Sequence, residues 1–384
     1  MIFAAIKLSL RKNSARAYII GASLAAISAC SPPPSTKVLI DTATLSFLDS
    51  YKSFSIASQE LATATTEYCQ SPNNDAQFEL ARTKWKDAAK QWSSIQNIQF
   101  GPLMVDNQAW KIQFWPDKKN LIARKVESLL KEDGPITQQR VDEASVVVQG
   151  LSSLEYLLFD NKAGTPQRYI DELGQRRCEL LVAVSEHLHT VSAELYNNWR
   201  IDGGNYLSTF SNTGDKNPEF PDDNVAIAYL LDTLVSGIEL IKRDKLERPL
   251  GISGTGQETE ARPAQTQVYQ LEWWRSQYSK DAIITNLIAL KGIFNANEGY
   301  GIDDYLREVK QQGELSDNIN KAFQQSIAAA SGIDGSLFEI ANKPERRQAI
   351  LGLHAELTHL LALLRNDLPT VLGVSLGFNS KDGD

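Results

Sequence analysis

The sequence predicts an all-α fold of two antiparallel helical bundles packed side by side. Prolines are sparse over most of the 384 residues, and the stretches between them repeat apolar residues at intervals of three and four. That spacing places apolar side chains on one face of a helix. No comparable run of alternating β-branched residues, the pattern of a strand, occurs. Residues 202–221 are rich in turn-forming residues, so we expect a linker there and a bundle on either side.

The expected helices follow in order along the chain. In the N-terminal bundle, residues 39–201, the periodic stretches are 39–68, 75–98, 118–130, 137–159 and 169–199. In the C-terminal bundle, residues 222–384, they are 222–243, 280–294, 315–331 and 344–364. A loop from Pro249 to Pro263 interrupts the second half and is a candidate flap.

The N-terminus has the pattern of an export signal. Four cations precede an apolar run from Tyr18 to Ala29, and Cys30 follows directly. We predict a signal peptide over residues 1–29. A retained membrane anchor is the alternative, but the run is shorter than the roughly 20 residues that a spanning helix needs.

Cys30 is a candidate lipidation site. The aliphatic and small residues before it, Ile27 to Ala29, look like the lipobox of bacterial lipoproteins, whose cysteine is acylated, for example with palmitate. Ser31 replaces the aspartate that often retains such proteins in the inner membrane, so we expect an outer-membrane lipoprotein that faces the periplasm. Residues 30–38 are Pro-rich and are expected to form a stiff tether.

Composition and charge exclude several classes of protein. With 42% hydrophobic and 22% charged residues, the chain has enough apolar surface for sizeable cores and is not a disordered protein. The net charge is −8, and residues 1–29 hold four of the cations and no carboxylate, so the mature chain carries −12. Nucleic-acid binding requires clustered cations, so we expect no nucleic-acid partner.

Two cysteines remain if Cys30 carries lipid. In an oxidising periplasm we expect a disulfide between Cys69 and Cys178. The bond would close a loop of about 108 residues, worth about 4 kcal/mol in the chain-entropy model. The alternative is two unpaired buried thiols.

The most informative helix includes residues 144–159, where Glu155 is the single ionisable side chain. Helical spacing places Ser152 beside Glu155 at the edge of the apolar stripe, facing inward. A carboxylate there needs a cation, a metal, hydrogen-bond donors or a raised pKa. Pairing with an arginine of a neighbouring helix is the purely structural alternative. Gly150 weakens a helix by roughly 1 kcal/mol, which predicts that another backbone approaches closely at this position.

Histidine spacing does not support a metal site. The chain has four histidines, at positions 187, 189, 354 and 359, and neither pair has the four-residue spacing of a zincin. We expect these histidines at the surface or hydrogen-bonded in the core. Nucleophile, phosphate-loop and paired-cysteine metal motifs are also absent from the sequence.

Two other clusters are candidates for ligand binding. Trp115 and Asp117 lie where one helical stretch ends and the next begins, and Asp117 is also suited to cap the following helix. Arg275 follows Trp273 and Trp274, a group that can stack on a flat ligand or fill the space between bundles.

Residues 150–159 resemble the signature of the imelysin family, Gly-x-His-x-x-Glu followed by aromatic and aliphatic residues. Gly150 and Glu155 match this pattern, whereas Ser152 stands in place of the histidine. Residues 100–102, 111–120 and 376–384 are also similar to segments of imelysin-like lipoproteins.

This resemblance implies two helical bundles, an envelope location and a link to bacterial iron uptake. The family histidine and glutamate are discussed as metal ligands, so iron or another divalent metal is the implied cofactor, although a serine hydroxyl is a poor ligand compared with imidazole. We expect a non-enzymatic protein that binds an iron-related ligand or an envelope protein partner at a cleft between the bundles. The alternatives are a metallopeptidase that uses Glu155 and a purely structural envelope protein.

Overall fold

The computed structural model describes residues 31–252, 266–341, 343 and 346–375. Within these ranges every regular element is helical and no strand occurs, which confirms the all-α prediction. All the helices described below belong to one compact unit, which begins at Pro33. Three expectations lie outside the described residues: the signal peptide with Cys30, most of the Pro249–Pro263 loop, and the segment 376–384.

The N-terminal helices begin earlier than the expected tether allows. Helix α1 (Pro34–Asp41) starts inside residues 30–38, because Pro34 suits the first turn of a helix and the hydroxyls of Ser35 and Thr36 donate to Asp223. It continues through the π-helical segment η1 (Thr42–Leu48) into α2 (Asp49–Gln70). Residues 34–38 are therefore helical, and the expected tether does not extend over them.

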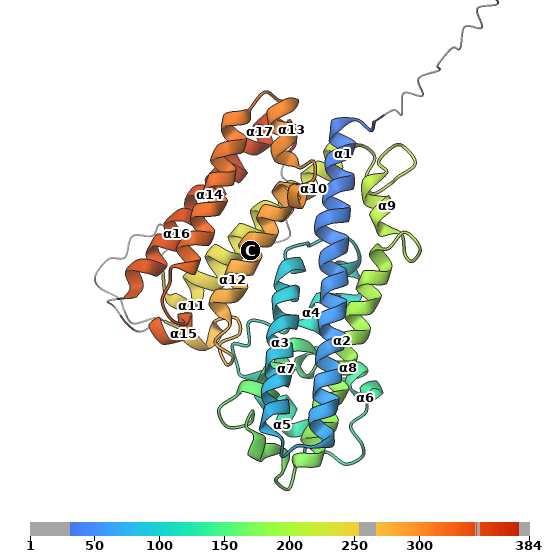
Figure 1. Ribbon diagram of the computed structural model, residues 1–384, viewed down its shortest axis with the longest axis vertical. Helices are drawn as coiled ribbons and strands as arrows, with labels where there is room; N and C mark the ends of the chain where they lie inside the picture. The colour runs from blue at the N-terminus through green and yellow to red at the C-terminus, as the bar shows by residue number, and fades with distance from the viewer. Residues whose placement is uncertain (1–30, 253–265, 342, 344–345, 376–384) are drawn as a thin grey trace, which may run out of the picture. The chain divides into compact units, whose positions relative to one another are not determined.

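The first group of helices packs around α2. Its remaining members are α3 (Asp75–Ile95), η2 (Gly101–Asn107), α4 (Gln108–Ile112), α5 (Leu121–Leu129), α6 (Gln138–Asp142), η3 (Val146–Val148), α7 (Gly150–Phe159), η4 (Pro166–Tyr169) and α8 (Gly174–Trp199). Helices α3 and α8 lie along α2, and α7 packs against both of them (Figure 1).

The predicted helix over residues 137–159 is wrong as one element. It is divided into α6, η3 and α7, because Gly150 has φ +62°, outside the helical region, and Gln149 is extended. Val148 therefore belongs to η3, not to the helix that carries Ser152 and Glu155. Residues 118–130 and 169–199 are helical only from Leu121 and Gly174 onward.

The second group follows a short helix in the predicted linker, α9 (Tyr206–Ser211). Its members are α10 (Asp223–Glu239), the π-helical η5 (Leu240–Glu247), α11 (Arg248–Leu250), η6 (Val268–Gln270), α12 (Ser279–Phe294), η7 (Ala296–Glu298), α13 (Ile302–Glu308), α14 (Gly313–Ser331), α15 (Leu337–Ile340), α16 (Arg347–Ala362), η9 (Leu363–Asp367) and α17 (Leu368–Leu372). The continuous stretch from Asp223 to Leu250 is long and apolar enough to cross a membrane, but more than half of its most apolar window is buried in the core.

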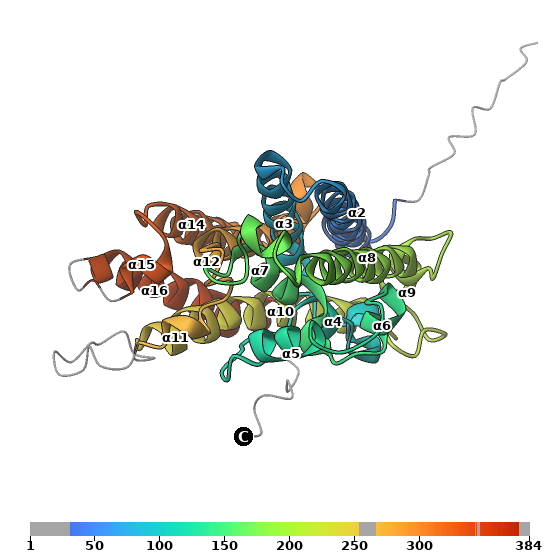
Figure 2. The same cartoon turned by 90° about the horizontal axis from the view of Figure 1, so that it is seen from below.

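The two groups meet where α3 packs against α12 (Figures 1 and 2). Helices α10, α12, α14 and α16 contact one another on the far side of this seam. The placement of the domain boundary at residues 202–221 stays a prediction.

The expected disulfide is present and joins α2 to α8. Cys69 and Cys178 are bonded, with their Cα atoms 5.4 Å apart. The bond fixes two long helices that already pack along each other, so it stabilises the group that carries α7.

Candidate functional site

Helix α7 starts under the backbone of α4. A Cβ at Gly150 would lie 2.2 Å from the carbonyl oxygen of Ile112 and 2.4 Å from that of Lys111. Only glycine fits such a contact, and only glycine adopts φ +62° at little cost. The predicted close approach of another backbone at Gly150 is therefore confirmed.

Ser152 joins α7 to the segment that follows α4. Its hydroxyl accepts from the amide of Phe114 at 3.1 Å and donates to the carbonyl of the same residue at 3.2 Å. The side chain is 3% exposed. The serine that replaces the family histidine thus satisfies an extended stretch of backbone.

Glu155 is buried and receives its hydrogen bonds from the loop before α12. Its Oε1 accepts from the amide of Ser276 at 3.0 Å and from the hydroxyl of Ser276 at 2.8 Å. Burial raises the pKa of Glu155 above its ordinary value, and the charge of Arg275 and the Ser276 hydrogen bonds oppose that rise. The sequence left open how a buried carboxylate at Glu155 is accommodated, and the structure shows both hydrogen-bond donors and a raised pKa.

Arg275 acts on Glu155 by its charge and through its main-chain amide, while its side-chain hydrogen bonds go elsewhere. Its guanidinium donates to Asp160 at 3.2 Å and to Asn120 at 2.8 Å, and lies 4.3 Å from the ring centre of Trp274. Trp273, in contrast, is 2% exposed and packs edge-on against the core. Of the two adjacent tryptophans, Trp273 therefore has the packing role given above as the alternative to ligand binding.

Asp117 and Trp115 have structural partners as well. Asp117 accepts from the amides of Leu121 and Ile122 at 2.6 and 3.1 Å, which confirms its capping role at the start of α5. The indole of Trp115 donates to the carbonyl of Gln270 at 3.0 Å, across the seam between the groups.

Five of the predicted site residues line one small cavity: Trp115, Asp117, Ser152, Glu155 and Arg275. The cavity offers about 20 Å³ to the centres of water-sized molecules. A single water needs roughly 10–15 Å³ by this measure. The sequence thus identified residues that converge in space, but the cavity that they share holds about one water and no larger ligand.

The residues around Glu155 do not fit a metal ion. Ser152 is bonded to backbone on both its donor and acceptor sides, and one oxygen of Glu155 is occupied by Ser276. Within the described ranges, no group of three histidine, cysteine or carboxylate side chains is arranged to hold a metal. Two histidines are buried, and each is hydrogen-bonded to a carboxylate: His187 to Asp142, and His354 to Glu247.

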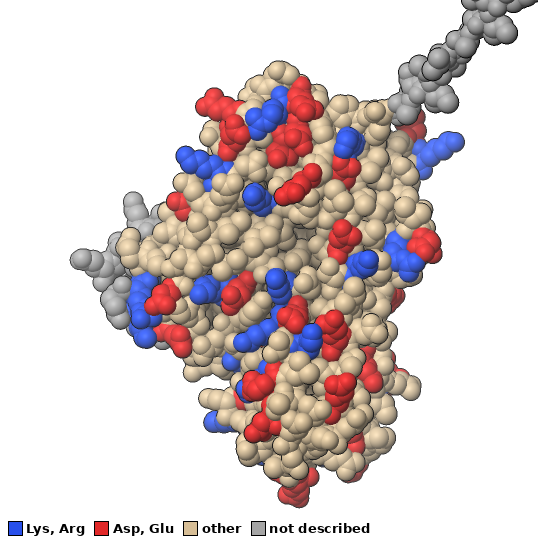
Figure 3. Space-filling model, in the orientation of Figure 1, with Lys and Arg blue, Asp and Glu red and all other residues tan. Residues whose placement is uncertain are grey.

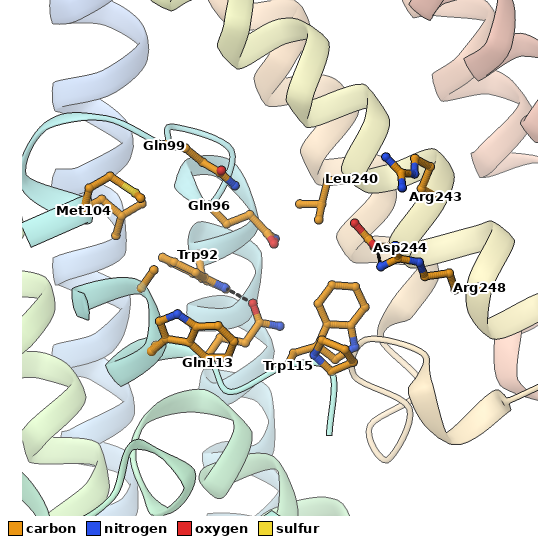
Figure 4. Close-up of a pocket in the computed structure, with 14 residues that line it drawn as sticks. Trp92, Gln96, Gln99, Met104, Gln113, Trp115, Leu240, Arg243, Asp244 and Arg248 are labelled. Carbon is orange, nitrogen blue, oxygen red and sulfur yellow. Dashed lines mark hydrogen bonds and ion pairs between the residues drawn. The ribbon is translucent and has the colours of Figure 1, made fainter. Parts of the chain in front are cut away.

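A much larger cleft lies on the other side of Trp115, between α3 and α4 on one wall and η5 on the other (Figure 4). Its volume is about 650 Å³. The residues that line it are Trp92, Gln96, Gln99, Leu103, Met104, Ala109, Trp110, Gln113, Trp115, Pro116, Leu240, Arg243, Asp244 and Arg248. Of these, Trp115 was the one that sequence reasoning had selected.

Beneath the cleft, a buried polar network connects the two walls. Trp92 donates to Gln113 at 2.6 Å, and Gln113 donates to Glu272 at 2.9 Å. Lys245 donates to Glu272 and to Asn286, both at 2.6 Å. Burial lowers the pKa of Lys245, and the adjacent Glu272 carboxylate opposes that effect. The floor of the cleft is therefore held by charge-assisted bonds that span both groups of helices.

One sequence signal could have pointed to this network. Lys245 continues the apolar face of residues 222–243, where a cation needs a buried partner. No spacing rule identifies that partner, because Glu272 is 27 residues away, beyond a loop.

A basic hollow of about 460 Å³ lies on a different face. Arg82, Lys86, Arg275 and Lys280 line it, together with Asp281 and Glu339. Figure 3 shows basic and acidic side chains intermingled on the face that it presents. Arg82 and Lys280 donate to main-chain carbonyls, so these two cations hold loops in place.

The architecture and the site define an all-α protein with a signature helix at the seam between two helical groups. The chain belongs to the imelysin family, whose model, Imelysin (peptidase M75), matches residues 47–364. No curated protein matches the sequence.

The fold is similar to that of solved structures, two of which are described here. An imelysin-like protein from Psychrobacter arcticum 273-4 is 18% identical with a TM-score of 0.70, and the match covers 90% of this chain and 97% of that one. A putative iron-regulated protein A precursor from Parabacteroides distasonis ATCC 8503 is 16% identical with a TM-score of 0.69, covering 88% and 96%. At these identities the likeness shows the fold alone.

Proposed function

We propose that the protein is a lipid-anchored, periplasm-facing envelope protein that acts in iron uptake by binding an iron-related ligand in the cleft between α3, α4 and η5. The cleft is the observation that carries this proposal. Its volume of about 650 Å³ lies within the roughly 300–1,000 Å³ of small-molecule sites, and its walls come from both groups of helices.

The surroundings of Glu155 favour binding over peptide hydrolysis. A general base or a metal ligand must reach a substrate. Glu155 instead bonds to Ser276 beside a cavity with space for about one water. The iron connection rests on family membership and on the similar fold of a protein described as iron-regulated.

Filling the cleft tests the function. Leu240→Trp adds bulk to one wall, and Ile288→Trp is the matched control, because Ile288 is 54% exposed on α12 and does not line the cleft. In a strain that lacks the gene, uptake of radioactive iron under iron limitation is measured after complementation with each variant. We expect the wild type and Ile288→Trp to restore uptake and Leu240→Trp to fail, with equal amounts of folded protein. The proposal is contradicted if the strain complemented with Leu240→Trp takes up as much iron as the strains complemented with the wild type and Ile288→Trp. It is also contradicted if the uncomplemented strain takes up as much iron as the strain complemented with the wild type.

The lipid anchor and the absence of catalysis are tested separately. Cys30→Ser is expected to abolish incorporation of labelled palmitate and to release the protein from the outer-membrane fraction.

Purified wild type, Glu155→Gln and Ser152→His are expected to be equally inert toward peptide substrates. Hydrolysis that requires Glu155 and a bound metal would instead support a metallopeptidase.

A further inference from the structure

We propose that the ligand of the cleft is a flat aromatic molecule that carries a negative charge. This inference rests on the proposed function and gives the ligand a chemical class. In the cleft, Trp92 and Met104 lie on one side, and the cationic side chains of Arg243 and Arg248 lie on the other, together with Leu240 (Figure 4). A ligand that matches both sides has an aromatic body and an anionic group at one end.

The aromatic side is formed by three indoles. Trp92 and Trp115 line the cleft (Figure 4), and Trp110, which also lines it, lies on α4. Trp110 is 46% exposed and Met104 is 56% exposed, so large apolar surface faces the solvent at the cleft mouth. Contiguous exposed apolar surface marks a binding site more often than a random surface. Indole faces and edges favour stacked or edge-on contacts with another ring.

The opposite wall carries cations on η5 and α11. Asp244 is paired with Arg248, which neutralises that carboxylate. Arg243 lines the same wall, and its guanidinium forms no ion pair or hydrogen bond with a described residue. The wall therefore offers one uncompensated guanidinium, whose planar donors suit a carboxylate or a similar anion. In a mature chain of net charge −12, this local excess of positive charge selects against cationic ligands.

Gln96 is a second polar feature of the cleft. It lines the cleft and is 8% exposed, and its amide nitrogen has no acceptor among the described residues. Its carbonyl oxygen is occupied by Lys245 at 3.3 Å. A buried N–H without an acceptor costs roughly 1–3 kcal/mol. An acceptor oxygen on a bound ligand would remove that cost.

The proposal is tested with simple probes on the purified mature protein. Binding of 2-naphthoate is measured by calorimetry and by the change in tryptophan fluorescence. The comparison probes are 2-naphthylmethylamine, which has the same rings and the opposite charge, and octanoate, an anion without a ring. We expect 2-naphthoate to bind at least tenfold more tightly than either comparison probe. Equal affinity for the amine removes the anionic requirement, and equal affinity for octanoate removes the aromatic one.

Variants then assign the two ends of the probe. Arg243→Gln and Trp110→Leu should each weaken 2-naphthoate binding about tenfold, the effect of losing one charge-assisted or ring contact. Arg243→Lys and Trp110→Phe should recover part of the affinity. Arg124→Gln is the matched control, because Arg124 is exposed on α5 and does not line the cleft. Undiminished binding in both Arg243→Gln and Trp110→Leu, or no binding to the wild type, overturns the proposal.

The same variants separate this inference from the proposed function. If Leu240→Trp abolishes iron uptake while 2-naphthoate does not bind, the cleft functions with a ligand of another class. If 2-naphthoate binds as expected while the cleft variants take up iron normally, the ligand class is right and the iron-uptake role is wrong.

Discussion

The ammonium nitrogen of Lys245 lies 2.6 Å from a carboxylate oxygen of Glu272, and both side chains are 1% exposed. Lys245 belongs to η5, one wall of the cleft, and Gln113 connects Glu272 to the other wall. Burying two charges costs several kcal/mol per ion. This pair persists because Lys245 also donates to Asn286 and Glu272 also accepts from Gln113.

Breaking this pair on one side is expected to be costly. Lys245→Met leaves Glu272 buried without its cation and should lower the free energy of unfolding by about 3–5 kcal/mol. The double variant Lys245→Met/Glu272→Leu removes both charges and should be clearly more stable than the single one. Urea denaturation measures the wild type, the single variants Lys245→Met and Glu272→Leu, and the double variant. A double variant whose loss equals the sum of both single losses would show that the two groups are not coupled.

Gly150 is expected to tolerate no side chain. Gly150→Ala combines a left-handed backbone, which costs about 1–2 kcal/mol, with a clash against the carbonyl of Ile112, so we expect a loss of about 3 kcal/mol or more. Gly352→Ala is the control, because Gly352 lies inside α16 with open space around it and should gain about 1 kcal/mol. In thermal and urea unfolding, the midpoint should fall for Gly150→Ala and rise for Gly352→Ala. If Gly150→Ala leaves the free energy of unfolding unchanged, the close contact between position 150 and the carbonyl of Ile112 is contradicted.

Glu155 should make stability depend on pH. Because the pKa of Glu155 is raised in the folded state, the folded protein binds that proton more tightly than the unfolded chain does. The resulting stabilisation is complete below the ordinary pKa near 4.5 and is lost as the pH rises through the raised value. Glu155→Gln lacks this loss, so its stability relative to the wild type should increase with pH.

Urea unfolding between pH 4 and 8 measures this difference. Glu186→Gln serves as the control, because Glu186 is an exposed carboxylate on α8, whereas Glu155 is buried. A difference between Glu155→Gln and the wild type that stays constant with pH would contradict the assignment.

The disulfide should contribute through the unfolded chain. The double variant Cys69→Ser/Cys178→Ser removes the cross-link between two residues that are 109 positions apart in the sequence. In the chain-entropy model, its free energy of unfolding should be about 4 kcal/mol lower than that of the wild type. Reductant should destabilise the wild type by a similar amount and leave the variant unchanged. If reductant lowers the free energy of unfolding equally in the wild type and in the double variant, the stabilisation does not come from this disulfide.

The sequence by itself determined the helical class, most helices, the cysteine pair and the signature residues of α7. These features depend on local spacing, since residues three or four apart share a helix face. Asp117 was likewise predictable as a cap because a cap acts within one turn.

Tertiary structure alone decided where the predicted helix over residues 137–159 breaks, which cavity surrounds Glu155, and where the large cleft lies. The break depends on the backbone of Ile112, and the cleft joins Trp92 to Arg248 across two groups of helices. Such contacts follow from the packing of distant segments, which sequence periodicity does not encode. The partnership of Lys245 with Glu272 has the same origin: each charge is visible in the sequence, but burial together is a property of the folded chain.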